Sequence, residues 1–591
     1  METVKTTCES NNEAAANIED REKDMTATTD ATAGGKPLTR NEQLKIAIPT
    51  LAGNIAATLA DSTTDCFSAD DEQFLKFHGI YQQDDRDKRK TGKVHSLMIR
   101  GRIPGGVLTP NQYRVFDDLA DKYGNQTLRI TTRQSIQFHG VAKSGLGKLM
   151  KGIHDALLDT IAACGDVNRN VMSAPTPASD EIRQQVYEDA RAVSEALLPK
   201  TKAYHSIWVD GVQLDLESSE NKEFVDPLYG KQYLPRKFKA AFVIPPVNDM
   251  DIFTNCLGFI AIVENGKLVG YNLTAGGGMG RSHGNDATYA RLADVIGFVT
   301  PAQIIPVAKA ILTIHRDFGD RTDRKHARLK YVLAEKGVEW FRAELAQRTG
   351  FAVAAARDYK LTQQGDLYGW HKQVDGRKFL TLFVESGRIK DAGSYKLKAA
   401  LRAISEQFDV EFRLSGNQNI IVANVKTADQ ASIDALLAAH GVRTSNQASL
   451  LHSASLACPA LPTCGLALAE AERYLPGLID RIESVTTELG LATEEITIRM
   501  TGCPNGCARP YMAEIGFVGK APGRYQIWLG GSQNGTRLAR LHKDNVKDPD
   551  LIPELRLVLE QFATTRTSGE RFGDWVERSL WKPSIPVAAV A

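Results

Sequence analysis

Two distant stretches of the chain show the same order of apolar and polar positions. Residues 94–141 begin with the alternation of a half-buried strand, continue with apolar residues every three or four positions as in an amphipathic helix, and return to alternation. Residues 379–425 repeat this strand–helix–strand order. A unit that recurs in the same order predicts an internal duplication.

The final strands of the two stretches align residue by residue, so that Arg413 falls on Arg129 and Gln418 on Gln134. Each stretch is followed by a segment that predicts a mixed α/β unit. We therefore predict an α+β fold, formed by pseudo-twofold duplication of a ferredoxin-like unit plus a mixed α/β unit, with three lobes around one central cleft.

The N-terminal 45 residues contain few aromatic or branched apolar side chains, which predicts a disordered leader. They lack the apolar core of a signal peptide, and their acidic residues do not suit a transit peptide. Residues 41–61 show helical periodicity. No apolar run approaches the roughly 20 residues of a membrane span, so we expect a cytoplasmic protein. A net charge of +1 gives no reason to expect nucleic acid or a membrane as a partner.

Four of the eight cysteines fall in two short loops, Cys458 with Cys464 and Cys503 with Cys507. Thiols grouped in this way in a reducing compartment usually hold metal or do redox work. Zinc sites typically space their paired cysteines by about two to four residues, which the first pair exceeds. Four thiolates also suit an iron–sulfur cluster, although neither common ferredoxin spacing is present. Spacing alone therefore leaves a cluster, a zinc ion and unligated thiols as alternatives.

Lys237 and Lys239 precede an apolar run, and residues two apart on a strand face the same side. A solvated strand face is the ordinary explanation. If the strand is buried, however, two ammonium groups on one inner face require anions nearby.

The first copy of the duplicated unit also carries cations that the second copy lacks. Arg133, Gln137 and His139 occupy alternating positions of one predicted strand face, a geometry that can line a cofactor. The alternative for His139 is a core histidine with satisfied hydrogen bonds. Because Arg133 and His139 have no counterparts in the second copy, we expect one functional cleft and one structural partner.

The residues around the cysteines, CPALPTCGLALAEAER and TGCPNGCARPYMAEIGFVGKAPGRY, resemble the sirohaem–[4Fe-4S] sulfite and nitrite reductases. MIRGRIPGG and FHGIYQQDDRD are similar to segments of the same family, and the matches cover most of the chain. The resemblance implies that Cys458, Cys464, Cys503 and Cys507 bind a [4Fe-4S] cluster, and that Cys507 also bridges to the iron of sirohaem. It also implies a pseudo-twofold fold with both cofactors at the domain junction.

Sirohaem carries eight carboxylates and sulfite is an oxyanion, so both call for arginine and lysine. The resemblance assigns sulfite binding and proton delivery to Arg102, Arg169, Lys237 and Lys239. We expect the sirohaem pocket to be lined by Arg100, Arg129, Arg133, Gln137 and His139.

The activity implied by the resemblance is the six-electron reduction of sulfite to sulfide, in sulfate assimilation and cysteine biosynthesis. Sulfite enzymes of the family have Lys-x-Lys where nitrite reductases tend to have Asn at the second position, and Lys237-Phe-Lys239 fits the sulfite enzymes. A sirohaem nitrite reductase and a non-catalytic iron–sulfur electron carrier are the alternatives.

The electron donor has to be a second protein, because no Gly-x-Gly-x-x-Gly lies between a predicted strand and helix. FHGIYQQDDRD resembles the NADPH-dependent enzymes, which implies a flavoprotein alpha subunit carrying FAD and FMN. CARPYMAE and GGGMGRSH also resemble ferredoxin-dependent members, so ferredoxin is the alternative donor.

These arguments divide the chain into six segments. We expect a leader at 1–45, an arm that contacts a partner at 46–93, the first ferredoxin-like half at 94–160, the first α/β unit with the substrate cations at 161–350, the second ferredoxin-like half at 370–440, and the second α/β unit with the cluster ligands at 441–591.

Overall fold

The computed structural model describes residues 32–33, 36–177, 180–200, 208–209, 212–213, 225–444 and 448–581. Most of the predicted leader lies outside these residues. Within them, no helix combines the length and apolar character needed to cross a membrane.

Two five-stranded sheets form the ferredoxin-like halves, in the orders β16-β6-β7-β4-β3 and β14-β15-β20-β19-β5. The strands of the first are β3 Ile80–Asp84, β4 His95–Arg100, β6 Leu128–Ile130, β7 Ile136–Val141 and β16 Arg388–Ile389. Those of the second are β5 Val107–Leu108, β14 Gly369–Lys372, β15 Lys378–Leu382, β19 Glu411–Leu414 and β20 Ile420–Val425. Each half thus gives one edge strand, β5 or β16, to the sheet of the other half. This exchange confirms the predicted duplication.

Equivalent side chains also cross between the halves. Gln134 Nε2 donates to the carbonyl of Leu414 (2.9 Å), and Gln418 Nε2 donates to the carbonyl of Ile130 (3.4 Å). Both glutamines have left-handed backbones, with φ of 51° and 72°. Since Gln134 aligns with Gln418 and Ile130 with Leu414, the two bonds are related by a pseudo-twofold axis.

The helices of the halves follow the apolar periodicity of the sequence. α5 (Pro110–Tyr123) begins after Thr109, which forms a capping box with Gln112, and ends at Gly124. Its counterpart is α12 (Leu397–Gln407), and α6 (Leu146–Asp155) and α13 (Gln430–Ala439) complete the helical layer.

The helical periodicity of residues 41–61 is confirmed in part, because the chain forms two short helices separated by a turn. α2 (Arg40–Ala47) ends before Pro49, whose ring restricts the preceding residue to an extended backbone, and α3 (Ile55–Ala60) begins after a turn. α4 (Ala69–Phe77) then leads into β3.

The two mixed α/β units contain the other large sheets, β10-β11-β12-β13 and β21-β22-β23-β24-β25. Their strands are β10 Ala240–Val243, β11 Leu257–Glu264, β12 Lys267–Ala275, β13 Asp294–Val299, β21 Ser455–Ala457, β22 Ile498–Thr501, β23 Ile515–Ala521, β24 Arg524–Leu529 and β25 Arg540–Lys547. Their helices are α7 Glu181–Ala196, α9 Ile304–Phe318, α10 Leu329–Lys336, α11 Val338–Thr349, α14 Leu450–Ser453, α15 Leu475–Glu488, α16 Asp548–Thr565 and α17 Phe572–Val576.

The two units repeat the same core motif. β10 pairs in parallel with β11, as β22 does with β23, and the next strand in each sheet is antiparallel. The isolated parallel bridge between Met172 and Ala241 takes the place that β21 has beside β22. The second unit is therefore a variant of the first.

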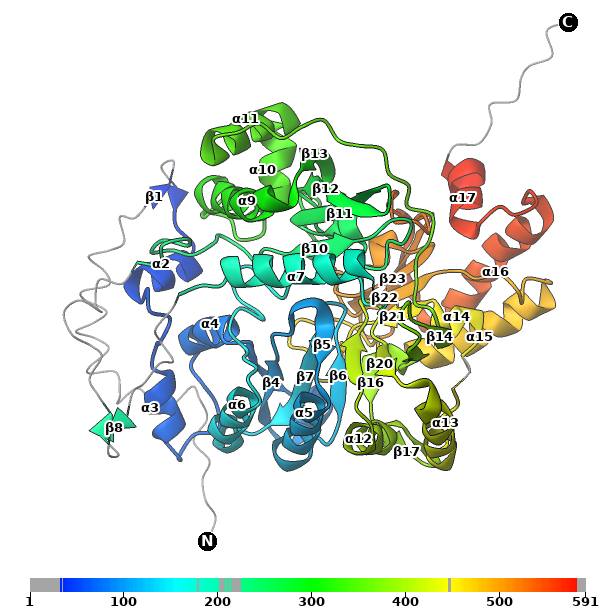
Figure 1. Cartoon of the computed structure of the whole chain (residues 1–591), viewed down its shortest axis with the longest axis horizontal. Coiled ribbons are helices and arrows are strands. Elements are labelled where there is room, and N and C mark those ends of the chain that lie inside the picture. Colours follow the sequence, from blue (N-terminus) through cyan, green and yellow to red (C-terminus); the bar gives the residue numbers. More distant parts are fainter. Residues whose placement is uncertain are drawn as a thin grey trace, which may run out of the picture.

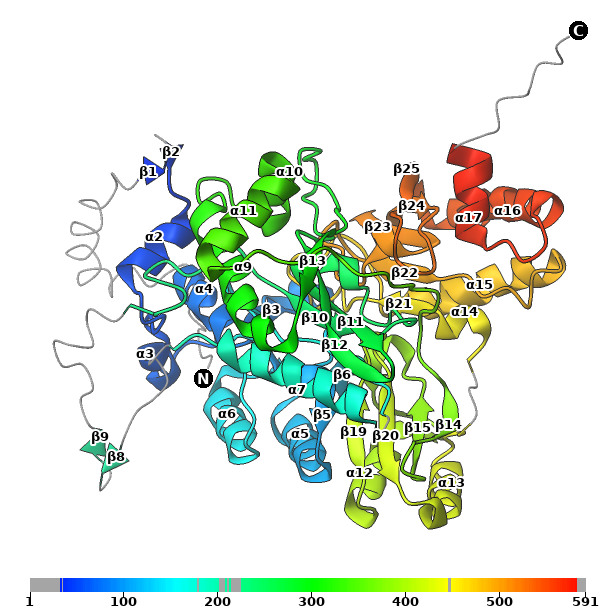
Figure 2. The same ribbon diagram turned by 45° about the horizontal axis from the view of Figure 1, so that its top comes forward.

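The elements gather into three lobes (Figures 1 and 2). The ferredoxin-like halves lie side by side at the bottom of Figure 1, the first α/β unit lies above them in green, and the second unit lies to the right in orange and red. One apolar core runs through both halves and the first unit, whereas the second unit has a core of its own. The cysteine loops belong to the second unit, so side chains from the other lobes can face them.

Candidate functional site

Two adjacent strands bring the cysteines together. Cys458 directly follows β21, and Cys503 and Cys507 follow β22, which is parallel to β21, so both loops leave the same edge of the sheet. The Cys458 Sγ accepts a hydrogen bond from the Gly502 amide (3.4 Å). Burial, and next the neighbouring Cys507, raise the pKa of the Cys503 thiol to about 12. Close thiols in this arrangement resist ionisation unless a metal compensates their charge.

The spread of the four thiols argues against one metal ion. Zn–S bonds of about 2.3 Å in a tetrahedron require sulfur atoms roughly 3.8 Å apart. Within the residues described, no three of the cysteine sulfurs lie within 4.8 Å of one another. In this structure the set is therefore too open for a single zinc ion.

Lys237 and Lys239 face the cysteine loop. They lie just before β10, and Phe238 between them is fully buried and bridges to Asn168. Burial lowers the pKa of both lysines well below its usual value, and neighbouring cations lower it further, whereas Cys507 raises both. Phe238 is buried and both lysines are half-buried, as alternation predicts, and the charges of both ammonium groups interact with Cys507.

Arg133 and Arg169 extend this cationic group. Arg133 donates to the Asn255 side chain (2.9 Å) and to two backbone carbonyls, but its buried Nε has no partner in the described part of the chain. Burial lowers the pKa of Arg133 to about 9. Arg169 is buried, and its guanidinium donates to the Gly165 carbonyl (3.0 Å). Arg133 itself lies in the turn between β6 and β7, so the expectation that it shares a strand face with Gln137 and His139 is wrong.

Three more cations were missed by the sequence analysis. Arg236 precedes Lys237, and Arg328 and Lys330 lie at the start of α10. Burial, and next Arg328, lower the pKa of Lys330 to about 7. The signal was present, because Arg328 and Lys330 are two residues apart before an apolar run, as Lys237 and Lys239 are.

The Gly276–Gly278 loop approaches two of these cations closely. A Cβ on Gly278 would lie 2.9 Å from the Arg328 guanidinium and 3.3 Å from the Lys330 stem. A side chain at position 278 would therefore displace these two cations.

Arg102 and Arg129 lie outside this group, in ion pairs. The Arg102 guanidinium contacts Asp159 (2.7 Å) and Glu195 (3.0 Å). Arg129 contacts Glu472 (2.8 Å) and the Ala457 carbonyl (2.8 Å), and so joins the first ferredoxin-like half to the strand before Cys458.

Arg100 and His139 are available to a ligand instead. Arg100 has no ion pair among the described residues, and it donates to the Gln137 side-chain oxygen (2.7 Å) when that amide is turned to face it. The His139 ring is buried, and neither nitrogen has a partner in the parts of the chain that are placed. Burial, then Arg388 and Arg129, lower the pKa of His139 well below its usual value, so the ring is neutral at ordinary pH.

The cations near Cys507 lack compensating carboxylates. No ion pair of Lys237, Lys239, Arg133, Arg169, Arg328 or Lys330 occurs within the described ranges. Burying several cations together is costly unless an anion joins them. The donor set, with its orphaned Arg133 and His139 nitrogens, fits a ligand rich in carboxylates together with a small oxyanion.

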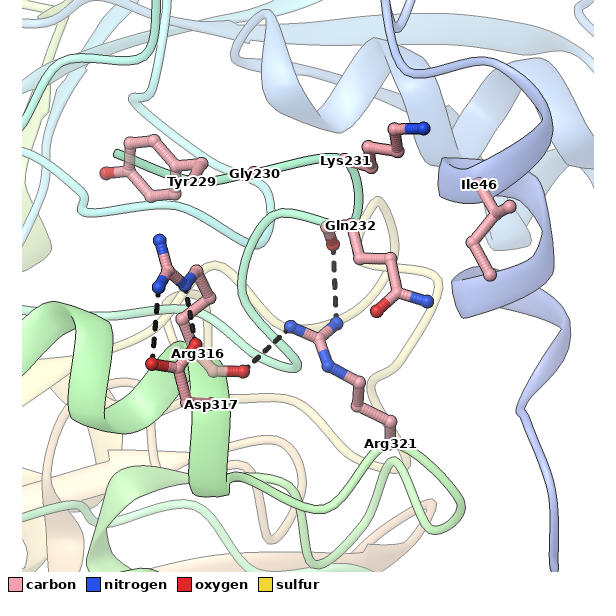
Figure 3. A pocket seen from close by; sticks show the side chains of 8 residues that line it. All are labelled: Ile46, Tyr229, Gly230, Lys231, Gln232, Arg316, Asp317 and Arg321. Atoms are coloured by element: carbon pink, nitrogen blue, oxygen red, sulfur yellow. Dashed lines mark hydrogen bonds and ion pairs between the residues drawn. The ribbon is translucent and has the colours of Figure 1, made fainter. Parts of the chain in front are cut away.

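A cavity of about 550 Å³ elsewhere in the molecule does not compete with this site (Figure 3). It is lined by Lys231, Arg316, Arg321 and neighbouring residues, and by no cysteine. Arg316 binds Asp317, and Arg321 binds the Gln232 and Arg316 carbonyls, so both guanidinium groups are already occupied.

Comparison with known proteins identifies the family. The family model described as nitrite/sulfite reductase ferredoxin-like half domain matches residues 89–156 and 371–440. The model described as nitrite and sulphite reductase 4Fe-4S domain matches residues 188–352, in the first α/β unit.

Curated relatives agree over almost the whole length. The "Sulfite reductase [NADPH] hemoprotein beta-component" of Shouchella clausii is 48% identical over 541 residues, covering 90% of this chain and 94% of the relative. The proteins of the same name from Bacillus subtilis and Myxococcus xanthus are also 48% identical, covering 91% and 93% of this chain and 95% and 98% of theirs. The chain therefore belongs to the sirohaem and iron–sulfur nitrite and sulfite reductase family.

The fold is also that of a solved structure, "Structure of Mycobacterium tuberculosis NirA protein". The TM-score is 0.75 at 22% identity, over 92% of this chain and 97% of that one. This similarity confirms the α+β architecture.

Proposed function

We propose that the chain is the haemoprotein component of an NADPH-type sulfite reductase, which reduces sulfite to sulfide. The observation that carries this proposal is the group of buried and half-buried cations near Cys507 that have no carboxylate partners among the described residues. The names of the relatives support the substrate and the donor type.

The cofactors of this proposal are a [4Fe-4S] cluster and sirohaem. Cys458, Cys464, Cys503 and Cys507 would hold the cluster, and Cys507 would also reach the sirohaem iron. When bound, the coupled pair supplies electrons one at a time and a metal centre for the substrate. The sirohaem carboxylates would be held by Arg100 and Arg133 and by groups near them, including Gln137 and His139.

Lys237, Lys239 and Arg169 are proposed to bind sulfite. Arg102 is left out of this role, because Asp159 and Glu195 already occupy its guanidinium. An anion beside the lysines stabilises their ammonium forms, so each lysine gains a proton that it can deliver to a leaving oxygen. Nitrite is the second candidate substrate, since the family model names both anions.

Anion binding is expected to take up protons. Burial holds the pKa of Lys237 and Lys239 below its usual value, and a bound oxyanion raises it again. The affinity for the anion therefore falls as pH rises from the pKa of the free site to that of the occupied site. Calorimetric titration of the holoenzyme with sulfite, in buffers of different ionisation enthalpy, measures the uptake. Binding without proton uptake across the pH range would show that the lysines do not face the anion.

We propose that an NADPH-oxidising flavoprotein delivers the electrons, with ferredoxin as the alternative. The surface beside the cluster supports docking of a protein donor. Cys464 is only half-buried, and Leu466 next to it is 65% exposed. Arg86 donates to the Gly465 and Ala467 carbonyls (2.6 Å each), which holds the basic segment 88–93 against this loop.

Reconstitution tests the function and the donor together. Purified holoenzyme is combined with sulfite and either a diflavin reductase and NADPH or reduced ferredoxin, and sulfide is measured. We expect sulfide from the flavoprotein mixture and none from NADPH without a second protein. Sulfide formation with NADPH and the haemoprotein alone would refute both donor assignments.

A further inference from the structure

A single buried carboxylate contacts both ends of the Cys503–Cys507 loop. Asp251 Oδ2 lies 2.6 Å from Arg499 Nη1 and 2.5 Å from Arg509 Nε. Arg499 lies in β22, just before the loop, and Arg509 lies two residues after Cys507. All three side chains are at least nine-tenths buried. Burial would raise the pKa of Asp251, but the two guanidinium groups outweigh it and lower the pKa, so the carboxylate is charged.

Arg509 also ties the loop to both ferredoxin-like halves. It donates to the carbonyls of Thr132 (3.1 Å) and Gly416 (3.0 Å), and the Thr132 hydroxyl donates to the Cys507 carbonyl (3.2 Å). Thr132 and Gly416 hold equivalent places in the two halves. The backbone on either side of Cys507 is thus fixed to three separate parts of the molecule.

The duplication explains why Asp251 and Arg509 meet. Both have left-handed backbones, with φ of 45° and 57°, and both precede a 3₁₀ helix, Ile252–Thr254 or Pro510–Met512. Both then lead into a strand of matching register, β11 or β23. They therefore occupy equivalent positions that face each other near the pseudo-twofold axis. Because one of these equivalent positions carries an acidic residue and the other a basic residue, the contact between them is an ion pair.

We propose that Asp251 is a positioning residue for the cluster. Its carboxylate holds the Cys503–Cys507 loop closed through Arg499 and Arg509. This inference rests on the proposed function, because it assigns the geometry of Cys503 and Cys507 to a residue of the other α/β unit. Gln364 Nε2 donates to the second Asp251 oxygen and orients the carboxylate. Without that charge, two buried guanidinium groups repel each other at the two ends of the loop.

The test compares Asp251→Asn with a matched control, Asp117→Asn. Asp117 is equally buried and also contacts two cations, Lys398 (2.9 Å) and Arg402 (3.0 Å), but it lies on α5. The rate of iron release to a chelator and the reduction potential of the cluster are measured in anaerobic holoenzyme. Loss of a charge-assisted hydrogen bond corresponds to roughly a tenfold or larger change in a rate. We therefore expect Asp251→Asn to release iron about tenfold faster than the wild type. Its cluster potential should also shift.

Asp117→Asn should lower the melting temperature but leave the release rate and the potential as in the wild type. Asp251→Glu, which keeps the carboxylate, should restore most of both values. If Asp251→Asn does not fold, Arg509→Lys is measured, and it should also release iron faster. If folded Asp251→Asn or folded Arg509→Lys releases iron at the wild-type rate, the inference is overturned but the proposed function is not. Absence of a cluster from the wild-type protein would overturn the proposed function, and the inference with it.

Discussion

Replacing Cys503 by serine is expected to yield a protein that retains neither the iron–sulfur cluster nor bound sirohaem. Cys503 is buried beside Cys458 and Cys464, and loss of one of four thiolates leaves the cluster with an incomplete ligand set. Under the proposed ligation, Cys507 would then lose the cluster that it would share with sirohaem. Iron, acid-labile sulfide and extracted tetrapyrrole are measured in the purified variant.

The matched control is Cys164→Ser, because Cys164 is also a buried free thiol but lies outside the four-cysteine set. That variant should keep full iron and sulfide. Full cofactor content in Cys503→Ser would contradict the ligand assignment, since no other described cysteine stands in its place.

Replacing Lys239 by asparagine is expected to weaken sulfite reduction selectively. The change removes one ammonium group from a desolvated anion site, where a charge-assisted hydrogen bond contributes about 1.5–3 kcal/mol. That corresponds to a fall of roughly 10- to 150-fold in kcat/KM for sulfite. Nitrite carries less charge and fewer oxygens, so its kcat/KM should fall less or should rise. Both cofactors should stay bound, because Lys239 is not among the proposed ligands of either.

Steady-state kinetics with the two anions measure this difference. Lys231→Asn is the control, since Lys231 is an exposed lysine nearby in the sequence that lines the cavity of Figure 3. It should leave both reactions unchanged. An equal loss with sulfite and nitrite in Lys239→Asn would show that this lysine does not select the substrate, and would favour nitrite as the natural substrate.

The duplication could be predicted because it is recorded in local patterns. Strand alternation and an amphipathic helix recur in the same order in both copies. The sequence alignment also paired Gln418 with Gln134, and these two residues make equivalent hydrogen bonds in the structure. The four cysteines were also evident, because two short loops carry half of the cysteines of the chain. Both features depend on neighbours in sequence.

Which arginines remain available to a ligand depends on distant partners and could not be predicted. Arg100 and Arg102 share one strand face by alternation, yet Asp159 and Glu195 reach only Arg102. Likewise, the ion pair of Arg129 with Glu472 joins segments from different lobes. Alternation along a strand predicts which face a side chain occupies, but only the packing of the lobes determines what it contacts there.

The position of Arg133 shows a further limit. Alternation predicted that Arg133 shares one strand face with Gln137 and His139, but the structure forms two strands with a turn that carries Arg133. The left-handed Gln134 in this turn was hidden, because glutamine gives no signal of the kind that glycine or asparagine gives.

The absorption spectrum of the purified protein tests the assignment of sirohaem and cluster most directly. We predict Soret and alpha bands of a haem-type tetrapyrrole together with the broad absorption of an iron–sulfur cluster, at about five iron atoms and about four labile sulfides per chain. Both bands should disappear in Cys503→Ser. A spectrum with cluster absorption and no Soret band would indicate an electron carrier, and would contradict a sulfite reductase.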